Sequence, residues 1–137
     1  MIQTVLFLIF SMTLASSMAD HTGAEEQGSL VVLWVSDDPY VAERVAFIYT
    51  HAAKNYEWFD DVTLIIWGPS AKLAAENLMI QDKLREMQKD GVRIKACIVC
   101  ANAYGVTDTL KGLDFEVKPM GKPLTDYLKG GIPVLTF

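Results

Sequence analysis

The sequence predicts an α/β protein, a three-layer α/β/α sandwich built on a five-stranded, mainly parallel sheet. Short apolar, β-branched runs without polar alternation recur along the chain, as expected of strands that are buried on both faces. Segments with apolar residues at helical spacing separate these runs, and the connections are only a few residues long. Strands that alternate with helices in this way form parallel sheets, because right-handed crossovers place the helices on the two faces.

The first strand and helix are delimited by an Asp-Asp-Pro sequence. Residues 30–36 (LVVLWVS) predict the strand, and Pro39 suits the first turn of a helix with Asp38 as its N-cap. We expect this helix to bury one apolar face. That face consists of Val41, Val45, Ile48, Tyr49 and Ala52.

The second strand and helix follow the same order. Residues 62–67 (VTLIIW) predict a buried strand that Gly68 and Pro69 close, and Ser70 is expected to cap one helix that continues to Lys89. Gly91 can end that helix in the left-handed conformation. The expected apolar positions of the helix are Leu73, Ile80, Leu84 and Met87.

The last third of the chain carries shorter elements. Residues 92–96 (VRIKA) predict a third strand that leads straight into Cys97. We expect a helix over residues 101–110, a strand over 115–117, one or two helical turns over 124–129 and a terminal strand over 133–137.

The N-terminal segment is set apart from this domain. Residues 5–15 (VLFLIFSMTLA) form an apolar run that is too short to span a bilayer and has the length of a signal-peptide core. Ser17 and Ala19 supply small residues at the −3 and −1 positions of a cleavage site. We therefore expect residues 1–19 to be a signal peptide, residues 20–29 a disordered acidic leader and residues 30–137 the domain. The protein would then be exported, periplasmic or secreted; if the apolar run is instead a buried helix, it is cytoplasmic.

The net charge limits the partners. The chain carries a formal charge of −5, and no charged residue precedes Asp20. A nucleic-acid surface would need clustered Lys and Arg, so we expect no nucleic-acid partner. We also expect no membrane association once the signal peptide is removed.

The two cysteines are the main functional candidates. Ligands of open parallel sheets bind beyond the carboxyl ends of the strands, and Cys97 and Cys100 fall at such an end as a Cys-x-x-Cys sequence. The amides of a following helix can stabilise a thiolate there, which would favour redox or sulfur chemistry. The alternatives are inert core packing and metal binding. A closed zinc site needs four ligands and His51 lies on another helix, so we expect no metal, and no other cofactor.

Other polar residues and a glycine are expected at the same edge. Asp37 could act as a carboxylate near the thiols or simply cap a helix. Ser70, after Gly68, could bind an anion at its helix start or serve as a cap. Asn102 and Tyr104 could hydrogen-bond a persulfide or lie on a solvated helix face.

Four stretches of the domain resemble the DsrE/DsrF-like family of small sulfur-relay proteins, in particular its uncharacterised branch of domain-sized members. They are VVLWVSDDPYVAERV, VTLIIWGPSAKLAAEN, GVRIKACIVCANAYGVTDTL and KPMGKPLTDYLKGGIPVLTF. The resemblance implies that Cys97, followed eight residues later by Gly105, matches the sulfur-carrying cysteine of the family. Cys100 matches a second cysteine that some members have. The resemblance also implies a homo-oligomer, a dimer, trimer or larger ring.

Three functions remain open at this point. In a sulfur carrier, which would be sulfurtransferase-like, Cys97 takes up sulfane sulfur as a persulfide from a donor protein and Cys100 helps to release it to an acceptor. In an exported thiol–disulfide redox protein, the two cysteines cycle between dithiol and disulfide. In a non-catalytic oligomeric binding module, both cysteines are inert.

Overall fold

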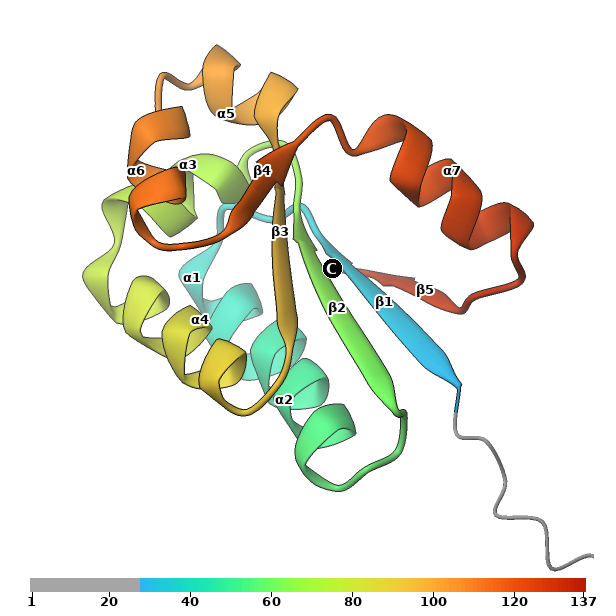
Figure 1. Ribbon diagram of the computed structural model, residues 1–137. Helices are drawn as coiled ribbons and strands as arrows, with labels where there is room; N and C mark the ends of the chain where they lie inside the picture. The colour runs from blue at the N-terminus through green and yellow to red at the C-terminus, as the bar shows by residue number, and fades with distance from the viewer. Residues whose placement is uncertain (1–27) are drawn as a thin grey trace, which may run out of the picture.

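The computed structural model describes residues 28–137, and its five strands form one sheet in which every pairing is parallel (Figure 1). The order across the sheet is β4-β3-β2-β1-β5. The predicted signal peptide, and the predicted leader up to residue 27, lie outside the described residues. The strands are β1 (Ser29–Trp34), β2 (Asp61–Ile66), β3 (Arg93–Cys97), β4 (Glu116–Lys118) and β5 (Val134–Thr136). The predicted fold class is therefore confirmed.

Helices cover the two sides of the sheet unequally (Figure 1). One side, which we call the helix-rich side, carries the larger core, formed by every second strand residue, such as Leu30, Val32 and Leu64. Its helices are α1 (Pro39–Val41), η1 (Ala42–Ala46), α2 (Phe47–Asn55), α3 (Ser70–Glu76), α4 (Leu78–Lys89), α5 (Ile98–Ala103) and α6 (Thr107–Gly112).

The other side, which we call the α7 side, is covered by α7 (Gly121–Lys129). A smaller core lies there, and it consists of Val31, Ile65, Cys97 and Met120. None of the residues of α7 is fully buried. Cys97 therefore belongs to the thinly covered side of the sheet.

The predicted buried face of the first helix is wrong at two positions, although Tyr49 does pack against the larger core. Val45 is 45 % exposed and Ile48 is 58 % exposed. The side that packs on the sheet is made instead of small residues and one aromatic ring, because small side chains let a helix backbone approach the strands closely. Those buried residues are Ala42, Ala46, Phe47, Thr50 and Ala53.

The helix predicted from Ser70 to Lys89 is divided in two. Asn77 adopts an extended conformation (φ −110°, ψ 110°), which ends α3. Its side-chain oxygen accepts hydrogen bonds from the amides of Met79 (3.0 Å) and Ile80 (3.2 Å), so it is the N-cap of α4. The predicted end of this segment at Lys89 is confirmed.

The helix predicted over residues 101–110 is also two helices. The first, α5, begins directly after Cys97 and ends in a turn in which the amide of Val106 donates to the carbonyl of Ala101. The second, α6, starts at Thr107. The early start of α5 brings Cys100 into its first turn. The N-cap predicted at Asp38 is confirmed, since its carboxylate accepts from the amide of Tyr40 at 2.8 Å.

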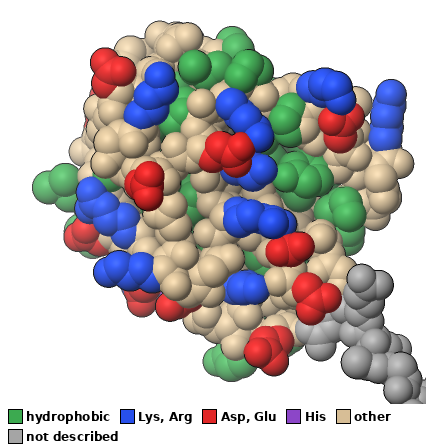
Figure 2. Space-filling model, in the orientation of Figure 1, with side chains coloured by type: hydrophobic (Ala, Val, Ile, Leu, Met, Phe, Trp, Pro, Cys, Tyr) green, Lys and Arg blue, Asp and Glu red, His purple; other side chains and the backbone are tan. Residues whose placement is uncertain are grey.

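Charged side chains of both signs are interspersed on the face of the molecule shown in Figure 2. Ion pairs among the described residues include Lys95 with Glu116 (3.1 Å) and Lys122 with Asp126 (2.7 Å). This face has no broad basic patch of the kind that nucleic-acid binding requires. Among residues 28–137, no helix is long and apolar enough to cross a membrane.

Candidate thiol site

Cys97 occupies the last position of β3 and caps the start of α5. Its backbone is extended (φ −74°, ψ 114°), and its side chain is 3 % exposed within the smaller core. Cys100 lies one turn into α5 and is half-buried, in contact with both cores. Both cysteines are free thiols. The predicted position of Cys97 at the end of the third strand is confirmed.

The surroundings of Cys97 favour its thiolate. Burial on its own would raise the pKa of the Cys97 thiol, because a charge is poorly solvated in the protein interior. Hydrogen bonds to the sulfur from the backbone of Cys100 and Met120 outweigh burial, and the thiol of Cys100 and the backbone of Val99 add to them. The pKa of Cys97 is therefore lowered from its ordinary value.

The surroundings of Cys100 have the opposite effect. Burial raises the pKa of its thiol, and the neighbouring Cys97 sulfur raises it further by hydrogen bonding and by charge. A hydrogen bond from the backbone of Gly68 acts against these influences without overcoming them. The pair is thus polarised, with Cys97 as the more acidic thiol and Cys100 as a protonated donor to it.

The two thiols open into a pocket of about 450 Å³ at the carboxyl edge of the sheet. The pocket has apolar walls and a single cationic side chain, Lys122, which is exposed and paired with Asp126. The walls are formed by Trp67, Val99, Pro119, Met120 and Gly121. A small molecule or an extended loop of another protein that enters the pocket would lie against both cysteines, although Cys97 itself is almost fully covered.

Of the other predicted site residues, the structure brings Gly68 to the thiols and keeps Ser70 away from solvent. Ser70 is fully buried, and its hydroxyl donates toward the carbonyl of Trp34 (2.6 Å) and accepts from the amide of Trp67 (3.0 Å). The Ser70 hydroxyl thus links the end of β1 to the end of β2 by hydrogen bonds. Its predicted role as a helix cap is wrong, because Pro69 occupies the N-cap position and the Ser70 hydroxyl is used between strands.

Asp37, Asn102 and Tyr104 do not line the thiol pocket. Asp37 is exposed after β1. The side-chain oxygen of Asn102 accepts a hydrogen bond from the hydroxyl of Thr107 (2.6 Å), and Tyr104 is exposed at the end of α5. Their binding roles stay predictions.

Sequence reasoning missed the segment from Pro119 to Lys122, which lies over Cys97. Trp67, at the end of the buried strand predicted over residues 62–67, packs against the smaller core and also lines the pocket, which the sequence did not indicate. The signal for Met120 was indirect: β4 pairs with β3, with Lys118 beside Cys97, so the residues after β4 must pass close to the thiol.

Among the described residues, no group of three or more His, Cys, Asp or Glu side chains is close enough to hold a metal ion. His51 lies away from the thiols, and its Nε2 is 2.6 Å from the carboxylate of Asp90.

Comparisons with known proteins agree with this architecture. A conserved protein of unknown function from Bacteroides thetaiotaomicron has a similar structure, with a TM-score of 0.79 and 33 % sequence identity. The match covers 84 % of this chain and 100 % of that protein. No curated protein matches the sequence. The model of the DsrE/DsrF-like family matches residues 30–137, from the first strand to the last residue. The chain belongs to the DsrE/DsrF-like family.

Proposed function

We propose that the protein is a sulfur carrier in which Cys97 forms a persulfide. The observation that carries this proposal is the polarised thiol pair: backbone groups of Val99, Cys100 and Met120 stabilise the Cys97 sulfur as an anion. A thiolate is the nucleophile of sulfur chemistry, and a lowered pKa increases its fraction at neutral pH. Membership of a sulfur-relay-type family supports the same reading.

Loading is a sulfur transfer without net oxidation. The Cys97 thiolate attacks the outer sulfur of a persulfide donor, R–S–SH. A sulfur–sulfur bond forms at Cys97, the bond between the two donor sulfurs breaks, and the donor leaves as the thiolate R–S⁻. The same backbone groups that stabilise the thiolate can then stabilise the anionic form of the new persulfide.

Release can follow two routes. An acceptor thiolate attacks the outer sulfur, takes it over and returns Cys97 as a thiolate. Alternatively, the Cys100 thiol loses its proton and attacks the inner sulfur, which expels hydrosulfide and leaves a Cys97–Cys100 disulfide that an external dithiol must reduce. The raised pKa of Cys100 favours the first route near neutral pH, because little of this thiol is ionised.

A thiol–disulfide redox protein is the second candidate. Its supporting observation is that Cys97, at the end of β3, and Cys100, in the first turn of α5, line the same pocket as free thiols. An oxidising compartment would favour the disulfide.

Single-cysteine variants distinguish these functions. Reduced protein is incubated with a persulfide donor and analysed by intact mass spectrometry. The sulfur-carrier function predicts that wild type and Cys100→Ser gain one sulfur atom, whereas Cys97→Ser gains none. The redox function predicts that wild type is isolated oxidised and that both variants lose the redox couple equally. If both thiols are labelled slowly and at equal rates, and only after the protein unfolds, both proposed functions are contradicted.

Export is proposed as well, from the apolar run of residues 5–15 and the small residues that follow it. The same mass measurement on protein from its native compartment tests this. A chain that begins at or near Asp20 agrees with export, whereas an intact Met1 on cytoplasmic protein contradicts it.

A further inference from the structure

Lys122 is the only charged side chain among the described residues that line the thiol pocket. The remaining walls are apolar, and no Asp or Glu lines the pocket. The chain as a whole carries a formal charge of −5, which disfavours the approach of anions in general. An anionic ligand of this pocket therefore has to be attracted by local positive charge.

The ammonium group of Lys122 is available for a ligand. Its side chain is 83 % exposed, and its present partner is Asp126, one helical turn away at 2.7 Å. Exposed pairs of this kind contribute little to stability, so the lysine can exchange one carboxylate for another. The first turn of α7 contains no acidic residue, and no side chain caps its start at Met120. The positive end of this helix is therefore not neutralised within its own first turn.

Two strand lysines add positive charge on the same side of the sheet. Side chains alternate along a strand, so Lys95 lies on the same side of β3 as Cys97. Lys118 of β4 is the register partner of Cys97 and lies on that side as well. Both lysines pair with one carboxylate, that of Glu116, which leaves one positive charge in excess among the three residues.

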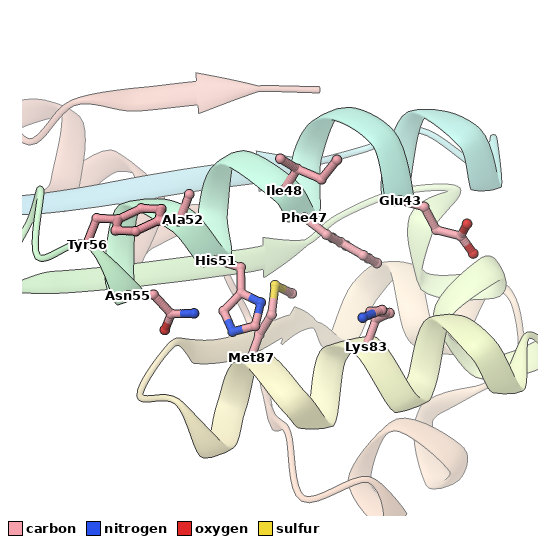
Figure 3. A pocket seen from close by; sticks show the side chains of 9 residues that line it. All are labelled: Glu43, Phe47, Ile48, His51, Ala52, Asn55, Tyr56, Lys83 and Met87. Atoms are coloured by element: carbon pink, nitrogen blue, oxygen red, sulfur yellow. The ribbon is translucent and has the colours of Figure 1, made fainter.

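The groove between α2 and α4 provides a contrast (Figure 3). Its volume of about 510 Å³ is close to that of the thiol pocket, but Glu43 lines it beside Lys83 and no cysteine does. Lys83 resembles Lys122 in being exposed and in pairing with an acid of its own helix, Glu86, at 2.8 Å. The groove therefore lacks both the thiol and the excess of positive charge, and Lys83 is a matched control for Lys122.

We propose, on the basis of the sulfur-carrier function proposed above, that the sulfur donor is a small-molecule persulfide with a carboxylate group, which Lys122 binds. Cys97 is 3 % exposed, and the outer sulfur of R–S–SH is the slimmest end of a donor that must reach it. A pocket of about 450 Å³ has the size of a small-molecule site. The Cys97 thiolate attacks the outer sulfur, the donor S–S bond breaks, and the donor leaves as a thiolate that keeps its carboxylate.

The first test varies the charge of the donor. The donors are the persulfides of 3-mercaptopropionate, 2-mercaptoethanol and cysteamine, which are similar in length and carry an anionic, a neutral and a cationic group away from the sulfur. Intact mass spectrometry measures the second-order rate constant of sulfur gain. Each variant is compared with wild type for the same donor, so that the intrinsic reactivity of the donor cancels.

Lys122→Gln is expected to slow loading by the anionic donor about threefold to fivefold, to leave the neutral donor unchanged and to speed the cationic donor. Lys122→Arg should retain the wild-type rates, and high salt should reduce the effect because exposed charges are screened. Lys83→Gln should leave all three rates unchanged. Equal slowing of all three donors by Lys122→Gln, or slowing of the anionic donor by Lys83→Gln as well, would overturn the proposal.

The second test varies the size of the donor. The persulfide of N-acetylcysteine is compared with a nine-residue peptide that carries one Asp beside a central persulfidated cysteine. The small donor should load Cys97 about ten times faster, because chain on both sides of the cysteine does not fit a pocket of this volume. A peptide that loads Cys97 as fast or faster would indicate a protein donor and contradict the proposal.

Cys97→Ser distinguishes a wrong donor from a wrong function. If wild type gains no sulfur from any donor, or Cys97→Ser gains as much as wild type, the sulfur-carrier function and the proposed donor both fail. If Cys97 is loaded but Lys122→Gln does not change the preference for donor charge, only the proposed donor fails.

Discussion

The two sides of the sheet differ in the size of the core that they bury and in whether that core includes Cys97. On the helix-rich side, seven helical segments bury the larger core within the described residues, and each contributes side chains to it or joins those that do. On the α7 side, a single helix covers a small core that includes Cys97. Stability is thus concentrated on one side, and the polarised thiol lies on the other. The segment that leads into α7 both covers the thiol and supplies the Met120 hydrogen bond to it.

Truncation of core leucines gives the largest expected effect of this difference. Leu64 is fully buried on the helix-rich side, and Leu64→Ala is expected to lower the free energy of unfolding by about 3–4 kcal/mol. Leu124 on α7 is only partly buried, so Leu124→Ala should cost about 1 kcal/mol. Urea unfolding followed by circular dichroism measures both. Equal losses would show that the two cores are not as unequal as the burial suggests.

The hydroxyl of Ser70 gives the next effect. Ser70→Ala removes the buried group that joins the ends of β1 and β2 and leaves backbone groups of Trp34 and Trp67 without that partner. We expect a loss of about 1–3 kcal/mol in the free energy of unfolding. Thr125→Val on α7 is the control, because its exposed hydroxyl bonds only to the Gly121 carbonyl (2.9 Å) and should cost about 0.5 kcal/mol or less. If Ser70→Ala lowers the free energy of unfolding no more than Thr125→Val does, the Ser70 hydroxyl does not stabilise the link between β1 and β2.

These differences explain which parts of the structure could be predicted from the sequence. The runs at residues 30–36 and 62–67 predicted β1 and β2 to within two residues at either end, because strands buried on both faces leave an uninterrupted apolar pattern. The buried side of α2 could not be predicted, since both its sides are apolar and periodicity does not say which one faces the sheet. The break at Asn77 was hidden by an apolar spacing that continues through it.

The candidate site was predictable to a similar extent. The positions of Cys97 and Gly68 could be predicted, because the carboxyl ends of parallel strands lie at one edge of the sheet. Met120 depends on which strand lies next to β3, and that order is set by tertiary packing rather than by local pattern. Asn102 was expected near the thiols because it is close in sequence, but the turn after α5 directs its side chain to Thr107.

Substitution of Gly68 should lower stability by a smaller amount and should also change the reactivity of a neighbouring thiol. Its backbone is left-handed (φ +67°), and a Cβ there would meet nothing within 4 Å, so Gly68→Ala should cost only the backbone strain of about 1 kcal/mol. Gly131→Ala is the control, with φ +72° and equally open surroundings. Both variants should lose similar stability, but only Gly68→Ala should change the alkylation rate of Cys100, to which Gly68 is hydrogen-bonded. If the alkylation rate of Cys100 is unchanged in Gly68→Ala, Gly68 does not contribute to the thiol site.

The smallest effect is a shift in the titration of Cys97. Its pKa is lowered in the folded chain by backbone hydrogen bonds and the Cys100 thiol, despite burial, so alkylation of Cys97 should reach half its maximal rate below pH 8.5, roughly the value of an ordinary cysteine. The folded state then gains stability as the pH rises from the folded pKa to the unfolded one, and loses it as the pH falls through the folded pKa.

Two substitutions of Cys100 isolate its contribution to that shift. Cys100→Ala removes the side-chain donor to the Cys97 sulfur and should move the midpoint of Cys97 alkylation to higher pH. Cys100→Ser retains an O–H donor and should leave the midpoint closer to that of wild type. The backbone hydrogen bonds persist in both variants, so the midpoint should not return to that of an unfolded control. If Cys97 is alkylated with the midpoint of the unfolded control in wild type and in both variants, the α7 side does not activate the Cys97 thiol. The two sides of the sheet would then differ in stability alone.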